Sequence, residues 1–390
     1  MNKLTHFTFA LAVLAYLALA SGSIKAETQT ASHPGFPRQA LAQIIEQELA
    51  QAPRPFFGTI LIADHASTQV LINKMTSGVS EPAVSEPQYI IGSLSKMITA
   101  TLVLRAIDQG KLQLNDKVSL YLGDNIHADV TVAGLLSHTS GIRGDAKILT
   151  DENAYANKHF QYSNLGYQLL GQLLTAINNR PLAKQISDFG RQFDLNLHAS
   201  FGDLKDAQLQ NPSLLAGFNE NVAVKPTQTS EDKQLKSDKP NTATYQRSQV
   251  ESLNFTESEL ASGFIQTDAA SFARFMHLLH TGKLLSSASY QAMTTTYGER
   301  KHRWGQLGYG YGVQINQITQ ITNAQRVKPI VEYSHSGYVS GFISSSIYYP
   351  QSQTSIVILE NTSWSLDDIS RVFSVHDIIR QQVLQQLIVK

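Results

Sequence analysis

The chain has 390 residues, in which 31 lysine and arginine residues balance 31 aspartate and glutamate residues, and it contains no cysteine. A net charge of zero without a long basic run argues against nucleic acid as a partner. The absence of cysteine excludes a disulfide framework and a lipid anchor on cysteine. The length suffices for a large core in one domain or two interleaved lobes.

The first residues have the pattern of a secretory signal peptide. Lys3 precedes a mostly apolar stretch over residues 7–20, which is short for a membrane span. Residues 1–26 are therefore predicted to be a leader, with Ala18-Leu19-Ala20 and Ile24-Lys25-Ala26 as possible cleavage sites; an uncleaved anchor is the alternative. The mature protein is expected to be periplasmic or secreted, without a stable membrane span.

The rest of the chain, residues 27–390, contains both helix-like and strand-like patterns. Helical spacing predicts a helix over residues 36–50, and two β-rich runs predict a hairpin over 56–63 and 70–72. The part from 93 to about 285 is predicted to be mainly helical, and strand signals return later. Further helices are predicted from Ser93 to Gly110 and over 131–136, 165–177, 269–280 and 366–388, and further strands over 312–315, 330–333, 342–349 and 355–359.

This order predicts an α+β fold in which strands from both chain ends form one antiparallel sheet flanked by helices. The sheet lobe is placed at about 36–90 and 305–390, and an inserted, mainly helical lobe at about 93–290. A ligand site is expected in a cleft between the two lobes. The polar segment 224–252 is expected to be an exposed loop.

Ser93-Leu94-Ser95-Lys96 places a hydroxyl and an amine one helical turn apart. A lysine at this spacing can take the proton of a serine and turn the serine into an acylating nucleophile. The same spacing recurs at Ser230 and Lys233, in a polar stretch without an apolar run. Only the first pair opens a helix that is predicted to be buried, so only that pair is expected to hold a fixed geometry.

Tyr162-Ser163-Asn164 precedes the predicted helix over 165–177 and supplies two further groups that such chemistry needs. Tyr162 can carry a proton to the leaving group, and Asn164 can orient the scissile amide. The alternative is that Asn164 only caps the helix and Tyr162 only packs. Tyr155-Ala156-Asn157 matches equally well but lacks an amphipathic helix behind it.

His335-Ser336-Gly337 lies between two predicted strands, where a strand edge could run antiparallel to an extended substrate. The backbone N–H of Tyr338 could join that of Ser93 in binding an oxyanion. The competing motifs are His33-Pro34-Gly35 and His280-Thr281-Gly282, and neither is on a predicted strand.

In this order, the three motifs resemble those of the penicillin-recognising serine hydrolases. This group includes class C β-lactamases, D-Ala-D-Ala carboxypeptidases, D-aminopeptidases and related esterases. The likeness covers about residues 56–359 and implies a β-lactamase/transpeptidase-like fold. Further sequence segments that are similar to this family are residues 91–96, 135–141 (Leu-Leu-Ser-His-Thr-Ser-Gly), 162–167, 261–264 (Ala-Ser-Gly-Phe) and 308–312.

The resemblance implies a role for each matching residue. Ser93 would attack the carbonyl, Lys96 would promote its deprotonation, and Tyr162 would pass the proton to the leaving group. Asn164, His335, Ser336 and Gly337 would bind substrate, and the N–H groups of Ser93 and Tyr338 would form the oxyanion hole. Water would then release the acyl group, and no metal or cofactor is expected.

Histidine stands at 335 where many β-lactamases and penicillin-binding proteins have lysine, so a partly charged clamp for a substrate carboxylate is expected there. Activity on carboxylate-terminated substrates is then expected to fall as the pH rises through the pKa of His335.

The function predicted is an exported serine hydrolase forming an acyl-enzyme on Ser93. A D-Ala-D-Ala carboxypeptidase-like enzyme or D-amino-acid peptidase is favoured, and its partners would be peptidoglycan fragments, other D-amino-acid peptides, β-lactams or esters. A carboxylesterase or β-lactamase is the alternative within the family. A catalytically silent binding or regulatory module is the alternative of another class.

Overall fold

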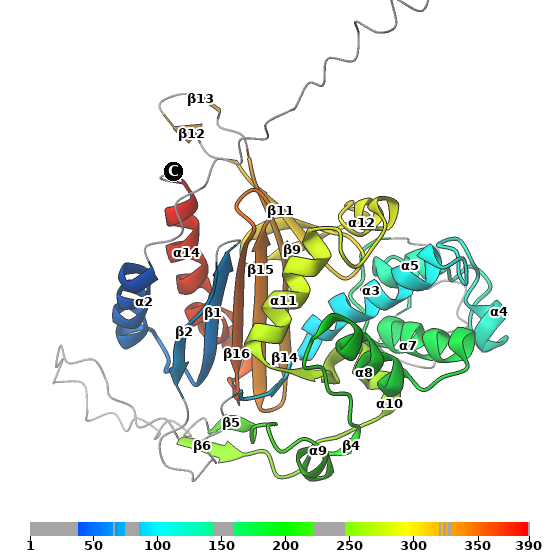
Figure 1. Ribbon diagram of the computed structural model, residues 1–390, viewed down its shortest axis with the longest axis horizontal. Helices are drawn as coiled ribbons and strands as arrows, with labels where there is room; N and C mark the ends of the chain where they lie inside the picture. The colour runs from blue at the N-terminus through cyan, green and yellow to red at the C-terminus, as the bar shows by residue number, and fades with distance from the viewer. Residues whose placement is uncertain are drawn as a thin grey trace, which may run out of the picture. The chain divides into compact units, whose positions relative to one another are not determined.

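A computed structural model describes residues 38–64, 67–74, 86–142, 159–221, 246–319, 321–322, 325–326 and 329–388. An antiparallel sheet of eight strands, in the order β2-β1-β16-β15-β14-β11-β10-β9, lies at its centre (Figure 1). The predicted α+β class is confirmed, and both chain regions supply strands. The strands are β1 (Gly58–Asp64), β2 (Ser67–Lys74), β9 (Gly298–His302), β10 (Gly305–Tyr309), β11 (Gln314–Ile318), β14 (Ile330–Val339), β15 (Phe342–Tyr349) and β16 (Thr354–Glu360).

Helices cover both faces of this sheet. Successive residues of a strand point to opposite faces, so Ile356 and Ile358 of β16 pack with helices α2 (Arg38–Gln51) and α14 (Ser374–Ile388). Val357 and Leu359 belong instead to the large core on the other face, which α11 (Ala269–His280) covers (Figure 1). Strands β15 and β16 are buried along their whole length because both of their faces are covered.

The helical lobe lies on the α11 side of the sheet (Figure 1). Its central helix α3 ends before Gly110, whose φ of +71° supplies the left-handed residue that stops the helix. The side chain of Ser163 caps α7 by accepting the N–H of Gly166 at 3.0 Å. The helices are α3 (Ser95–Asp108), α4 (Ser119–Leu122), α5 (Val132–Leu136), α7 (Asn164–Asn178), α8 (Leu182–Phe193), α9 (Leu204–Gln210), α10 (Glu257–Glu259), the π-helical turn η3 (Leu260–Phe264) and α12 (Ser287–Met293).

Short strand pairs tie the lobes and loops together. Strand β3 (Tyr89–Ile90) pairs with β8 (Gln266–Thr267), directly before the turn that carries Ser93. The other short strands are β4 (Gly202–Asp203), β5 (Phe218–Asn221), β6 (Gln246–Gln249), β7 (Asn254–Phe255), β12 (Ile321–Thr322), β13 (Gln325–Arg326) and β17 (Thr362–Ser363). Within the described parts of the chain, no helix has both the length and the apolar character needed to cross a membrane.

Several predicted elements are confirmed, and others need correction. The hairpin β1–β2, the strand β15 and the helix α11 agree with expectation. The prediction of a single C-terminal helix over 366–388 is wrong. A 3₁₀ turn η4 (Leu366–Asp368) and a short helix α13 (Ile369–Val372) come first, and Phe373 separates α13 from α14. The prediction that the segment 224–252 is a loop throughout is also wrong, because Gln246–Gln249 forms strand β6, which pairs with β5.

Some expectations fall on residues that the structure does not describe. The predicted leader and the rival motifs at His33, Tyr155 and Ser230 lie outside the described residues, as does most of the segment 224–252. The lobe boundaries stay a prediction.

Candidate active site

Ser93 lies in a 3₁₀ turn, η1 (Gly92–Leu94), directly before α3 rather than inside the helix as predicted. Gly92 has a φ of +52°, and a Cβ placed on it would lie 2.7 Å from the backbone nitrogen of Tyr338. A Cβ on Gly337 would likewise lie 2.9 Å from the backbone nitrogen of Ser93. The two glycines therefore allow the turn and β14 to touch, which brings together the two N–H groups of the predicted oxyanion hole.

Strand β14 offers a free edge beside this turn. Strand β11 pairs with β14 only from Ile330 to Ser334, whereas β15 pairs with it as far as Val339. Among the described residues, no strand occupies the other edge of residues 335–339. This half of β14 can therefore pair with an extended substrate, as the sequence predicted.

Lys96 is buried and its Nζ has three oxygen partners. It lies 3.0 Å from Ser93 Oγ, 2.8 Å from Asn164 Oδ1 and 2.6 Å from the carbonyl oxygen of Ser262. Ser262 belongs to the π-helical turn η3, and such turns frequently accompany functional sites.

Burial lowers the pKa of Lys96 well below its ordinary value. The amide oxygen of Asn164 and the carbonyl of Ser262 can only accept hydrogen bonds. A neutral Lys96 therefore gives its two hydrogens to these oxygens and directs its lone pair at the hydroxyl of Ser93. This arrangement fits a general base for the serine.

Tyr162 lies beside both Ser93 and Lys96. Its hydroxyl is hydrogen-bonded to the Ser93 side chain, and its ring centre lies 4.9 Å from Lys96 Nζ. Burial around the hydroxyl raises the pKa of Tyr162 to about 12, against the opposing effects of the Ser93 hydrogen bond and the Arg300 charge. About a third of the residue nevertheless remains open to solvent (37% exposed), which suits a group that meets substrate.

Asn164 is the first residue of α7 and is exposed. Its carbonyl oxygen is held by Lys96, whereas its amide NH₂ has no hydrogen-bond partner among the described residues. The NH₂ group is therefore free to donate to a substrate carbonyl. The capping role belongs to Ser163, so the alternative prediction that Asn164 only caps the helix is wrong.

The surroundings of His335, which lies beside Tyr162, do not favour the partly charged clamp that the sequence predicts. The residue is buried, its Nδ1 lies 2.8 Å from the carbonyl of Ser336, and its Nε2 lies 2.9 Å from the hydroxyl of Tyr309. Because a carbonyl only accepts, Nδ1 carries the proton and Nε2 accepts from Tyr309. Burial is the largest cause that lowers the pKa of His335, to about 3.

The remaining predicted residue, Ser336, points to the other face of β14. Alternation along the strand separates it from His335, and its Oγ lies 3.5 Å from that of Ser345. Ser345 in turn bonds to Nδ1 of His376 at 2.6 Å, on the face covered by α14. The structure therefore brings Ser93, Lys96, Tyr162, Asn164, His335 and the Gly337–Tyr338 backbone together, but not the Ser336 side chain.

Nothing in the sequence indicated that His138, within the matching segment 135–141, positions the backbone around Tyr162. Its carbonyl accepts the N–H of Gln161 at 2.7 Å, and its ring Nδ1 accepts the N–H of Ser163 at 3.2 Å. The residue adopts a φ of +59°, and its ring lies 4.5 Å from that of Tyr162. His138 thus fixes the backbone on both sides of Tyr162.

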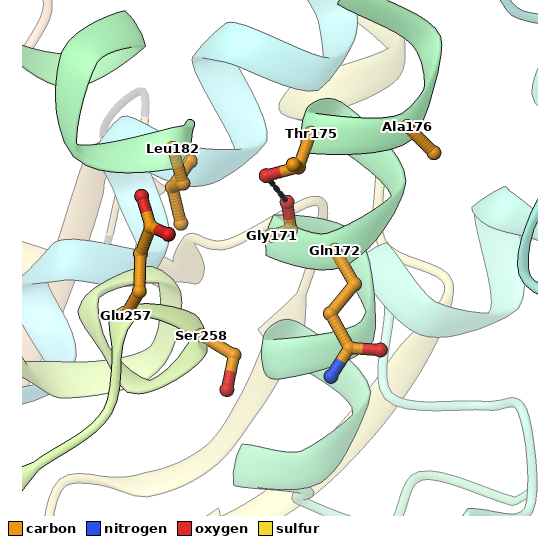
Figure 2. Close-up of a pocket in the computed structure, with 7 residues that line it drawn as sticks. All are labelled: Gly171, Gln172, Thr175, Ala176, Leu182, Glu257 and Ser258. Atoms are coloured by element: carbon orange, nitrogen blue, oxygen red, sulfur yellow. Dashed lines mark hydrogen bonds between the residues drawn. The ribbon is translucent and has the colours of Figure 1, made fainter. Parts of the chain in front are cut away.

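Two other features are separate from this site. The rival His280 is stacked on Tyr348 with ring centres 4.3 Å apart, and burial lowers its pKa to about 3. A pocket of about 280 Å³ opens between α7, α8 and α10, where Glu257 faces Leu182 and Thr175 bonds to the Gly171 carbonyl (Figure 2). None of the predicted catalytic residues lines this pocket.

Within the described part of the chain, no group of three or more His, Asp or Glu side chains is placed to hold a metal ion.

A family model described as Beta-lactamase matches residues 77–371. Protein flp of Staphylococcus aureus (strain N315) is 29% identical in an alignment of 185 residues that covers 39% of this chain. That alignment spans only 36% of the staphylococcal protein, so the chain matches about a third of its length.

Solved structures of low identity share the fold. A class C beta lactamase has a TM-score of 0.64 and 18% identity, covering 90% of this chain and 99% of its own. A D-stereospecific amidohydrolase from Streptomyces sp. has a TM-score of 0.61 and 18% identity, covering 87% of this chain and 98% of its own. At this identity the likeness establishes a common fold.

Proposed function

The chain belongs to the beta-lactamase family of penicillin-recognising serine hydrolases, and on that premise we propose that it forms an acyl-enzyme on Ser93 and hydrolyses D-amino-acid peptides. The observation that carries the proposal is the placement of Lys96. Its amine is buried, lies 3.0 Å from Ser93 Oγ, and has its other hydrogen-bonding directions taken by two acceptors.

Acylation follows from the positions of these groups. The neutral amine of Lys96 takes the proton from Ser93, and Oγ attacks the carbonyl carbon of the substrate. The N–H groups of Ser93 and Tyr338 stabilise the oxyanion, and one such donor typically contributes about 3–4 kcal/mol to the transition state. Tyr162 gives its proton to the departing amine, and water then hydrolyses the ester on Ser93.

The preference for D-amino-acid substrates has narrower support. The Streptomyces protein of the same fold is named as D-stereospecific, and the free edge of β14 suits an extended peptide. A carboxylesterase is the second candidate, because the neutral His335 removes the cation that many relatives have at this position.

The first test is intact-mass spectrometry of the protein mixed with benzylpenicillin, with Ser93→Ala as the control. A persistent adduct on the wild type alone supports acylation at Ser93 with slow deacylation. Rapid loss of penicillin without an adduct indicates β-lactamase activity. Hydrolysis of a p-nitrophenyl ester but not of a D-Ala-D-Ala peptide favours the esterase, and inertness to all of these probes overturns the proposal.

We also propose export, on the strength of the apolar stretch over residues 7–20. Fractionation of expressing cells, with the N-terminus of the product determined, tests this. Recovery of the unprocessed chain from the cytoplasm contradicts it.

A further inference from the structure

The π-helical turn η3 presents two consecutive carbonyl groups to helix α3. The last four carbonyls of a helix have no partner inside it, so those of Ala261 and Ser262 need donors from outside η3. Helix α3 supplies both donors. Lys96 Nζ donates to the Ser262 carbonyl at 2.6 Å, and the hydroxyl of Thr99 donates to the Ala261 carbonyl at 2.8 Å. The proposed base and a neighbouring hydroxyl therefore hold the same short turn.

Thr99 is placed for this contact by its position in the helix. It follows Lys96 by three residues, so the two side chains leave the same face of α3. Both residues are buried. A buried carbonyl that loses its donor is left unpaired, because water does not replace the donor. The position of the Ala261 carbonyl therefore depends on the Thr99 hydroxyl.

The other end of η3 is tied to the segment that carries the nucleophile. Ile265, which follows η3, donates its N–H to Ser95 Oγ at 3.2 Å. The carbonyl of Ile265 accepts the N–H of Ile91 at 3.0 Å, two residues before Ser93. Ser95 and Thr99 are one helical turn apart, so one face of α3 holds both ends of the turn.

We propose that Thr99 is a positioning residue for the base. By holding the Ala261 carbonyl, it fixes the adjacent carbonyl of Ser262 against Lys96, and this directs the lone pair of Lys96 at Ser93. Because Thr99 is buried, it acts through η3 and not on the substrate. The inference rests on the proposed function, in which Lys96 takes the proton of Ser93.

Replacing Thr99 with valine tests this, because valine keeps the shape of the side chain and removes its hydroxyl. We expect Thr99→Val to lower kcat/KM for a chromogenic ester by about 10–100-fold, as for a small displacement of a catalytic group. Thr99→Ser keeps the hydroxyl and should recover most of the activity. Unchanged kcat/KM in Thr99→Val would overturn the inference.

Thr101 supplies the matched control. It is buried in the same helix, and its hydroxyl also forms a bond of 2.8 Å, but to the Met97 carbonyl within α3 itself. Thr101→Val therefore removes the same group without loosening η3, and it should leave kcat/KM nearly unchanged. An equal loss in the two valine variants would overturn the inference and leave Thr99 with a packing role only.

The pH profile separates positioning from a simple loss of folded protein. A carbonyl that accepts a hydrogen bond from an ammonium favours the charged form. When the Ser262 carbonyl moves away, the pKa of Lys96 falls, so the rise of kcat/KM with pH should move to lower pH in Thr99→Val only. Partial unfolding would lower the rate without moving this rise. The titratable and charged groups around Lys96 are the same in both variants; they are Tyr162, Tyr167, His138 and His335, with Arg300 beside Tyr162.

Ser95→Ala loosens the other end of η3 and keeps the inference testable if Thr99→Val does not fold. It should change the rate and the pH profile in the same direction, and less strongly, since its bond to Ile265 is longer. A wild-type rate and profile in Ser95→Ala, with Thr99→Val unfolded, would overturn the inference.

An NMR titration of protein with ¹³C-labelled lysine measures the pKa of Lys96 without a substrate, and Lys96→Arg identifies its signal. A pKa that falls in Thr99→Val and not in Thr101→Val supports the inference even if no probe acylates the wild type, which would refute the proposed function. A pKa that is unchanged or raised in Thr99→Val would overturn the inference.

Discussion

At the scale of single residues, opposite shifts of two pKa values favour the proton transfers that we propose at Ser93. Burial lowers the pKa of Lys96, and burial raises that of Tyr162 to about 12. The lysine therefore gives up its proton more readily than the tyrosine, which remains protonated at neutral pH. Two groups whose environments separate their pKa values in this way take the roles of base and acid.

Replacing Lys96 with arginine tests the base directly. The guanidinium keeps a positive charge and does not lose its proton in proteins, so it cannot accept the proton of Ser93. Acylation should slow by about 10²–10⁴-fold, the usual contribution of general acid–base catalysis. Stopped-flow acylation by a chromogenic ester measures this, and a variant that acylates at near the wild-type rate would assign the base to another group.

The pH dependence should come from Lys96 and Tyr162 and not from His335. Activity needs a neutral Lys96, so kcat/KM rises with pH as this lysine loses its proton, and it falls as Tyr162 ionises near its pKa of about 12. His335, with a pKa of about 3, is already neutral at pH 5. The profile of His335→Gln between pH 5 and 8 should therefore have the wild-type shape. A decline centred near pH 6.5 that disappears in the variant would show that His335 carries charge.

At the scale of elements, the proposed oxyanion hole requires the contact between η1 and β14, and this contact depends on Gly92. Gly92→Ala meets both a φ of +52° and the backbone of Tyr338, so kcat should fall by about 10²–10³-fold, as for loss of one oxyanion donor. Gly110→Ala is the matched control, since Gly110 also has a positive φ but no atom within 4 Å of a new Cβ. The control should lose about 1–2 kcal/mol of stability and keep its kcat. Similar kcat values for the two variants would argue against the contact.

The segment around Tyr162 depends on His138 in a comparable way. His138→Ala removes the ring that holds the N–H of Ser163, and a displacement of about 1 Å in a catalytic group can cost about 10²-fold in rate. We expect a large fall in kcat with little change in KM. His138→Asn should restore part of it, because asparagine tolerates a left-handed backbone and supplies an acceptor. Equal activity of the alanine and asparagine variants would limit His138 to a packing role.

The sequence was informative where the signal is local and uninformative where it depends on distant residues. Hairpin β1–β2 and helix α11 follow from periodicity and turn residues. The pairing of Ser93 with Lys96 follows from their spacing. The choice of Tyr162 over Tyr155 follows from the amphipathic helix behind Tyr162. The neutrality of His335 depends on Tyr309 and on burial beneath the helical lobe, which no short motif contains. Arg300 lies 138 positions beyond Tyr162 in the sequence, so only the fold brings them together.

At the scale of the whole molecule, the two faces of the sheet carry different chemistry. One face carries His335 and Gly337 toward the helical lobe, and the other carries an ion-pair cluster under α14. In that cluster Arg54 forms two hydrogen bonds of 2.7 Å with Glu360, and Glu360 accepts from Nε2 of His376 at 2.7 Å. The cluster joins the segment after α2, strand β16 and helix α14, so we expect it to support the fold and not the reaction.

Glu360→Gln separates these two roles. The substitution leaves the buried Arg54 without its counter-charge, which typically costs about 3–5 kcal/mol of stability. The site lies on the other face of the sheet, so the kcat per folded molecule should stay within about threefold of the wild-type value.

Burial alone would raise the pKa of Glu360, but the charge of Arg54 and the hydrogen bond from His376 outweigh it and lower the pKa. This stabilisation is therefore present above the ordinary carboxyl pKa and is lost as the pH falls through the lowered one. Urea unfolding at pH 7 and at pH 3 measures the effect: the gap between wild type and variant should shrink at the lower pH. A constant gap, or a loss of kcat matching that of Ser93→Ala, would mean that the cluster acts on the catalytic face.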